Sequence, residues 1–205
     1  MRERDTAWLG PSTTRRRIRA TRAVAALALI VASTSVVSVA AARGSGCATA
    51  HTAVTATSRP ALQHAVVCLI NQQRRRRGLP ALREDARLDR SAQGWTNTMV
   101  ARHDFSHGPN FAARISAAGF HWSSAGENIA TGFLTPAAVV DAWMASTGHC
   151  HNILGPTYRY VGTGVSQRAI RGYGSGGGTW TQDFGLLRGQ APASGNWAPA
   201  NGCPY

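Results

Sequence analysis

The chain has 205 residues, with 22 arginines, nine acidic residues and a formal net charge of +13. This length suits one domain preceded by a leader, because about 150 residues are enough to bury a hydrophobic core. The charge does not by itself indicate a nucleic-acid-binding protein. Residues 1–42 hold seven of the arginines and two of the acidic residues, and without them the net charge is +8.

Residues 1–42 have the pattern of a secretory signal peptide. Arginines crowd positions 15–22, and residues 23–42 carry no charge. The small residues at positions 40–42 suit cleavage by a signal peptidase near Arg43. An uncleaved anchor is the alternative, because the apolar run approaches membrane-spanning length. We therefore expect a secreted or envelope-associated protein that does not bind nucleic acid.

Composition divides the remainder of the chain into three parts. Residues 43–60 are rich in Ala, Thr and Ser without periodicity, which predicts a linker. Residues 61–188 contain the periodic segments and are predicted to form one domain. Residues 189–205 are rich in Gly, Pro and Ala, which predicts an irregular tail.

Two helices are predicted at the start of the domain. The first has Val66, Leu69 and Ile70 on one face and ends at Gly78. Its end carries four consecutive arginines at positions 74–77, which are predicted to be solvated and could contact an anionic envelope polymer. The second helix places apolar residues at helical spacing: Leu88, Ala92, Trp95 and Met99.

Helix and strand signals alternate in the rest of the domain. Residues 111–118 predict a short helix, and Thr135-Pro136 predicts the start of another that ends at Gly148. Residues 158–166 and 179–184 are rich in β-formers and flank a glycine-rich segment, which predicts an antiparallel hairpin. Helices followed by strands indicate an α+β fold with helices packed on an antiparallel sheet.

All four cysteines lie beyond the predicted cleavage site, which indicates two disulfides in an exported chain. Three pairings are open. We expect Cys68–Cys150, which would join an early helix to the motif around His149, and Cys47–Cys203, which would join the two ends.

Three short strings carry residues that could perform chemistry. They are FSH at residues 105–107, GENIA at 126–130 and GHCHNIL at 148–154. Together they supply the imidazoles of His107 and His149 and the carboxylate of Glu127, groups that can share protons or bind a metal. Gly126 and Asn128 tolerate unusual backbone angles, so we expect a sharp turn that aims Glu127 inward.

These strings, in this order, resemble the CAP superfamily of cysteine-rich secretory proteins, venom allergens, pathogenesis-related proteins and secreted bacterial proteins. Trp143, the string WTQDF at residues 180–184, LINQQR at 69–74 and GLPAL at 78–82 support the resemblance to the bacterial branch. The resemblance covers about residues 64–186. It implies an α-β-α sandwich with a central antiparallel sheet flanked by helices.

The resemblance also implies a cleft lined by two histidines and two glutamates, which in many members binds a divalent metal such as zinc. His107, Glu127 and His149 match three of these positions, and Ser146 stands at the position of the second glutamate. Because a hydroxyl is a poor zinc ligand, we expect weak metal binding. The alternative is a hydrogen-bonded polar cluster without a metal.

Two classes of function follow from these residues. The first is a monomeric binding or interaction module for a small apolar ligand such as a lipid, or for an envelope component. The second is a metal-assisted hydrolase in which Glu127 is the general base. The missing second carboxylate favours the binding module over the enzyme.

Overall fold

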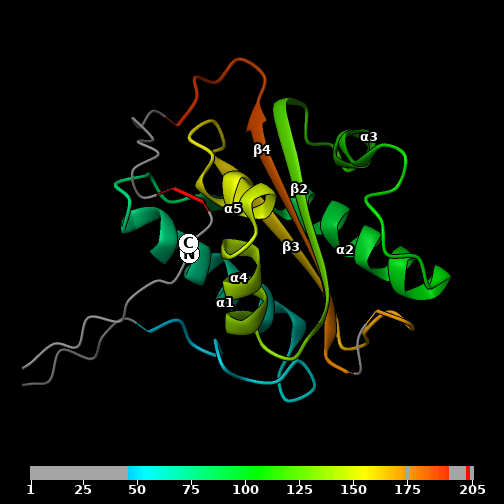
Figure 1. The fold of residues 1–205 in the computed structure, drawn as a ribbon. Helices are drawn as coiled ribbons and strands as arrows, with labels where there is room; N and C mark the ends of the chain where they lie inside the picture. The colour runs from blue at the N-terminus through cyan, green and yellow to red at the C-terminus, as the bar shows by residue number, and fades with distance from the viewer. Residues whose placement is uncertain (1–45, 174–175, 194–201, 204–205) are drawn as a thin grey trace, which may run out of the picture. The chain divides into compact units, whose positions relative to one another are not determined.

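The computed structural model describes residues 46–173, 176–193 and 202–203, so the predicted signal peptide lies outside the described residues. Figure 1 shows a sheet with α1, α4 and α5 on one side and α2 and α3 on the other, which confirms the predicted α-β-α sandwich. The elements follow in chain order: α1 (Arg59–Arg75), β1 (Arg83–Glu84), α2 (Ala86–Arg102), α3 (Phe111–Ala117), β2 (Trp122–Phe133), α4 (Pro136–Met144), α5 (Thr147–Leu154), β3 (Tyr160–Ser166) and β4 (Gly178–Leu187).

The sheet has the strand order β1-β3-β4-β2. β3 and β4 are antiparallel neighbours, which confirms the predicted hairpin. β4 also pairs with β2 in antiparallel register. The sheet is not antiparallel throughout, because the short strand β1 runs parallel to β3.

The predicted helix start at Thr135-Pro136 corresponds to the observed cap of α4. Thr135 accepts a hydrogen bond from the amide of Ala138, and Pro136 occupies the first turn of α4, where its missing amide costs nothing. The predicted apolar face of α2 is buried. On α4, the apolar side chains of Val139, Val140 and Trp143 pack in the main core against the sheet.

Two segments differ from the sequence prediction. Gly148 does not end α4, because that helix stops at Met144 and Gly148 lies in the separate helix α5. Gly126 and Asn128 do not form a sharp turn, because both lie inside the long strand β2 and neither has a positive φ. Gly126 is required by close packing instead, since a Cβ there would lie 2.5 Å from the hydroxyl of Tyr158.

Side chains cover the outer edge of β2, which pairs with another strand on one side only. The carbonyl of Ala125 accepts from Tyr158 (3.3 Å), that of Glu127 from Asn152 (3.1 Å) and that of Ile129 from Trp143 (3.3 Å). Exposed strand edges invite pairing with other chains, so these three contacts protect the sheet. They also attach α4 and α5 to the strand that carries Glu127.

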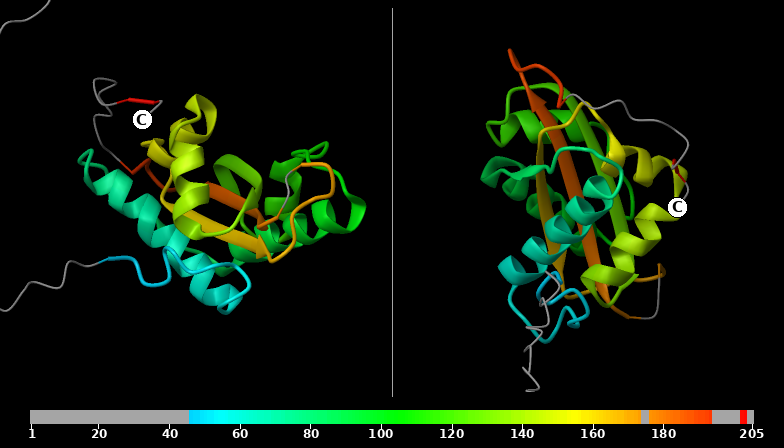
Figure 2. Two further views of the ribbon diagram at one scale, coloured as in Figure 1. Left: turned by 60° about the horizontal axis from the view of Figure 1, so that its bottom comes forward. Right: turned by 90° about the vertical axis from the view of Figure 1, so that its left-hand side faces the viewer.

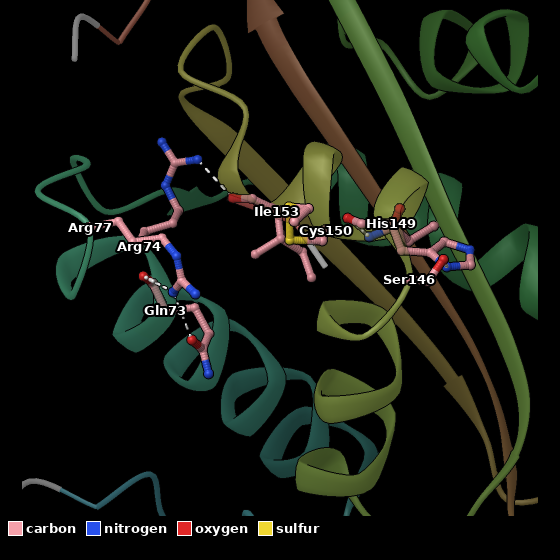
Figure 3. Close-up of a disulfide and its surroundings, with 9 residues drawn as sticks. Gln73, Arg74, Arg77, Ser146, His149, Cys150 and Ile153 are labelled. Carbon is pink, nitrogen blue, oxygen red and sulfur yellow. Dashed lines mark hydrogen bonds between the residues drawn. A yellow bond between two sulfur atoms is a disulfide. The ribbon is translucent and has the colours of Figure 1, made fainter. Parts of the chain in front are cut away.

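The arginine run at positions 74–77 is not uniformly solvated, because the side chain of Arg74 is fully buried. Its guanidinium donates to the carbonyls of Pro80 (2.8 Å), Ile153 (2.9 Å) and Gly155 (2.8 Å). Figure 3 shows Arg74 reaching from α1 to the C-terminal end of α5. Free carbonyls at a helix end attract a cation, which explains why a charge is stable there.

The disulfides connect Cys47 with Cys68 and Cys150 with Cys203, so both predicted pairings are wrong. Cys68 lies on α1, close to the N-terminal segment rather than to α5. Cys150 is buried on α5 and holds the end of the chain there (Figure 3). The count of four cysteines left the pairing open, and the packing of the segments decided it.

Residues 46–58, where the sequence predicted a linker, pack onto the domain. Val54 is fully buried and its amide donates to the carbonyl of Leu134 (2.8 Å). Ala50 accepts from the amide of Ala137 (2.8 Å). The segment therefore covers the start of α4.

The right-hand view of Figure 2 looks onto the face of the sheet that α1, α4 and α5 cover.

No helix within residues 46–173, 176–193 and 202–203 is long and apolar enough to cross a membrane.

Candidate functional site

Glu127 lies at the centre of the candidate site, on β2, and its side chain is 1% exposed. Nδ1 of His107 donates to its Oε1 at 2.8 Å. Nη2 of Arg114 donates to its Oε2 at 2.5 Å. Each carboxylate oxygen therefore has a partner, as a buried charge requires.

Arg114 is the residue that the sequence analysis missed. It lies on α3, and its guanidinium stacks on the ring of Trp95 at 3.9 Å from the ring centroid. It also donates to the carbonyl of His107 at 2.9 Å. Arg114 thus holds both Glu127 and the loop that carries His107. A basic residue in the predicted short helix between the first two motifs was the available signal.

Asp183 lies next to Glu127, on the neighbouring strand β4. The two residues are direct partners in the β2–β4 register, and Asp183 is 1% exposed. Within the described part of the chain, neither of its carboxylate oxygens has a hydrogen-bond partner. Burial raises the pKa of Asp183 well above its ordinary value, and the charge of Glu127 raises it further, while the charge of Arg114 opposes the shift. The site therefore places the buried Asp183 carboxyl, whose pKa is raised, directly beside Glu127 and its partner Arg114.

His149 enters the site from α5, on the opposite face of the sheet from α3. Its Nδ1 lies 2.9 Å from Oγ of Ser146, and Figure 3 shows the two side chains together at the start of α5. Burial lowers the pKa of His149, and the nearby His107 lowers it further. His149 is therefore a neutral imidazole at neutral pH.

Asparagines join the second and third motifs. Asn128 donates to the carbonyl of His149 at 3.2 Å, and Asn152 donates to Oδ1 of Asn128 at 2.9 Å. These contacts bring the second and third strings together in the fold. His107 and Glu127 are in direct contact, and His107 lies near enough to His149 to help lower the pKa of His149.

The contacts of Glu127 do not fit the metal that the family resemblance implies. Both carboxylate oxygens are engaged, one of them by the cation Arg114. Ser146 binds His149 in place of the second carboxylate. Among the described residues, no group of three or more His, Cys, Asp or Glu side chains is arranged to hold a metal ion.

An apolar groove of about 330 Å³ lies beside the polar cluster, at the outer edge of β2. Ala142 and Trp143 of α4 form one wall, and Phe105 and Tyr173 are on the other, with their ring centroids 5.4 Å apart. Ser146 and His149 supply polar groups at one part of the groove, and the other lining residues are Ile129, Ala130, Thr131 and Phe133.

The three-layer fold, the two disulfides and the strand-borne glutamate between two motif histidines define a class of compact, disulfide-stabilised domain with a polar cleft. The model of the cysteine-rich secretory protein family, CAP, matches residues 67–184, and the chain belongs to this family.

The relatives include bacterial proteins. The chain is 37% identical over 145 residues to the uncharacterized protein YkwD of Bacillus subtilis (strain 168), a match that covers 67% of this chain and 53% of YkwD. The chain therefore spans about half the length of that relative.

Solved structures agree on the fold. The crystal structure of an extracellular protein containing a SCP domain from Bacillus anthracis str. Ames has a TM-score of 0.55 at 27% identity, over 62% of this chain and 41% of that one. A cysteine-rich secretory protein from Staphylococcus aureus subsp. aureus Mu50 has a TM-score of 0.53 at 15% identity, over 63% of this chain and 40% of that one.

Proposed function

We propose that this CAP-domain protein is a monomeric, secreted or envelope-associated binding module for a small amphipathic ligand such as a single-chain lipid. The observation that carries the proposal is the groove beside β2, in which apolar side chains lead to the polar pair Ser146 and His149. Ligand sites are concave and mostly apolar, with a few polar groups that orient the ligand, and their volumes begin at about 300 Å³.

The polar pair gives the proposed ligand an orientation. The neutral imidazole of His149 and the hydroxyl of Ser146 can exchange hydrogen bonds with a carboxyl or hydroxyl group. The hydrocarbon part would lie between Trp143 and the pair Phe105 and Tyr173. Tyr173 is 51% exposed, and covering such a large apolar surface is favourable.

Two observations support a location outside the cell. The charge-free segment after the arginine-rich start predicts export. Two disulfides are typical of oxidising compartments. The similar protein from Bacillus anthracis is described as extracellular, which agrees with this proposal.

The hydrolase alternative has less support. A general base needs an oxygen free to take a proton from water. Both oxygens of Glu127 already accept hydrogen bonds, one of them from a cation, and the side chain is 1% exposed. We therefore favour the binding module over the enzyme.

The test is a titration with a fluorescent long-chain fatty acid. Ala142→Phe would fill the groove, because Ala142 lines it from α4. We expect this variant to lose affinity for the probe by about tenfold or more. Ala138→Phe is the matched control, since Ala138 is an exposed residue of the same helix that does not line the groove.

Glu127→Gln separates the two functions. The variant should retain probe binding if the groove is the site, because Glu127 does not line it. Equal probe affinity of Ala142→Phe and the wild-type protein, or no probe binding at all, would contradict the proposal.

A further inference from the structure

A second groove lies between α1, α2 and the end of β3, and it is polar. It consists of two adjoining hollows of about 400 and 520 Å³ that share Arg59, Gln93 and Asn97. No lining residue belongs to the apolar groove beside β2. The two grooves are therefore separate sites.

Side chains of α1 and α2 hydrogen-bond to the part of the β3 edge that does not pair with β1, and these bonds hold the floor of this groove in place. Gln93 accepts from the amide of Val165 (3.0 Å) and donates to its carbonyl (3.1 Å), as a neighbouring strand would. Asp89 accepts from the amide of Thr163 (2.9 Å). Gln63 of α1 donates to the carbonyl of the same residue. A site built on such fixed elements is preorganised.

The groove has an excess of positive charge. Arg59 and Arg168 line it from two sides and are exposed, and within the described residues neither guanidinium has a hydrogen bond or an ion pair. Arg90 adds a third positive charge. Asp89 is the one acidic lining residue, and its Oδ1 is engaged by β3. An anion would therefore meet two free guanidinium groups.

The other polar groups suit hydroxyls. Asn97 accepts from Gln93 at 2.9 Å, so its amide nitrogen remains available to a ligand. Thr57, Ser58 and Gln167 also line the groove. No aromatic side chain lines either hollow. The absence of stacking surfaces here disfavours nucleobases, which single-strand binding proteins hold on aromatic rings.

We propose that this groove binds a strand of an acidic polysaccharide. Carboxylates of the sugar units would pair with Arg59 and Arg168, because the guanidinium fork matches a carboxylate in a bidentate contact. Between the two arginines, sugar hydroxyls would form hydrogen bonds with the side chain of Asn97. The inference does not depend on the apolar ligand, since no residue is shared.

The test is calorimetric titration of the purified protein with oligogalacturonate, which carries both carboxylates and hydroxyls. We expect binding to oligogalacturonate and none to neutral dextran. Arg59→Ser combined with Arg168→Ser should lower the affinity by about tenfold or more. The matched control is Arg75→Ser combined with Arg76→Ser, which removes the same charge from exposed positions about 24 Å away along α1.

A second variant keeps every arginine. Asn97→Asp retains the oxygen that accepts from Gln93 and adds a negative charge to the groove, so it should also weaken binding. Loss of affinity in both groove variants with the control unchanged would support the proposal. Equal losses in the control, preferential binding of polyphosphate or single-stranded DNA, or no binding of oligogalacturonate would overturn it.

Discussion

Nη2 of Arg114 lies 2.5 Å from Oε2 of Glu127, so a guanidinium from α3 neutralises the buried carboxylate of β2. The family resemblance assigns this carboxylate to a metal, but here an arginine engages it. The cluster therefore contains a buried ion pair that joins β2 to α3.

Arg114→Met should destabilise the protein strongly. Removal of one partner leaves an uncompensated buried charge, which costs roughly 3 kcal/mol of the free energy of unfolding. Urea denaturation at neutral pH measures the loss. Arg102→Met, at an exposed position with the same change in charge, is the control and should have little effect. If both variants lose the same stability, the ion pair is not the cause.

A double variant isolates the pair itself. Arg114→Met with Glu127→Gln removes both charges, and we expect part of the lost stability to return. The interaction free energy comes from the four unfolding curves of the cycle. Strictly additive losses would show that the two side chains do not depend on each other.

Asp183 should make the stability fall as pH rises. Below about pH 3.9, its carboxyl is protonated in both the folded and the unfolded state. Above that value the unfolded state releases the proton first, because the pKa of Asp183 is raised in the folded state. The free energy of unfolding should then fall by up to about 1.4 kcal/mol per pH unit until the pH passes the folded pKa.

Asp183→Asn imitates the neutral acid and should abolish this fall. Unfolding free energies of the variant and the wild-type protein, measured from about pH 4 to pH 8, give the comparison. Asp141→Asn, at an exposed position of α4, is the control. A pH-independent difference between Asp183→Asn and the wild-type protein would refute the raised pKa.

Gly162→Ala should be severely destabilising. A Cβ at this position of β3 would lie 2.2 Å from backbone atoms of Leu88 and Asp89, where α2 packs directly on the strand. Overpacking of this kind costs about 3 kcal/mol or more, since neither backbone can give way. Gly94→Ala is the contrasting control. Nothing lies within 4 Å of its Cβ position, so the helix α2 should gain roughly 0.5–1 kcal/mol.

Arg74→Ala should unfold the protein at a lower denaturant concentration. The buried guanidinium binds three carbonyl groups, and its loss leaves them unsatisfied beside a cavity, at a cost of about 3 kcal/mol or more. Burial lowers the pKa of Arg74 to about 10, so the side chain stays charged at neutral pH. Arg75→Ala, at the exposed neighbour, is the control and should change the midpoint little.

Zinc should bind the wild-type protein weakly. Arg114→Gln frees an oxygen of Glu127, and Ser146→Glu adds the missing carboxylate. The double variant should bind zinc about tenfold tighter or better by calorimetry. Ser146→Glu alone should gain less, because Arg114 still holds Glu127. Submicromolar affinity in the wild-type protein that persists in His107→Ala would contradict this account of the cleft.

Local patterns in the chain were sufficient to predict the fold class and most of the helices. The spacing of apolar residues located α1 and α2, and Thr135-Pro136 located the start of α4. The motif strings also indicated that His107 and Glu127 would meet. Each of these features depends on short-range periodicity or on a recurrent local string.

Contacts between distant segments decided the rest. Glycine and asparagine suggested a turn at positions 126–128, but pairing with β4 makes that segment a strand. The sequence predicted that Arg74 is solvated, but in the fold the free carbonyl of Ile153 at the end of α5 accepts a hydrogen bond from it. The pKa of Asp183 is raised because its side chain is buried and strand register places it opposite Glu127. Burial and strand pairing depend on contacts between distant segments of the chain, so they cannot be predicted from a local sequence pattern.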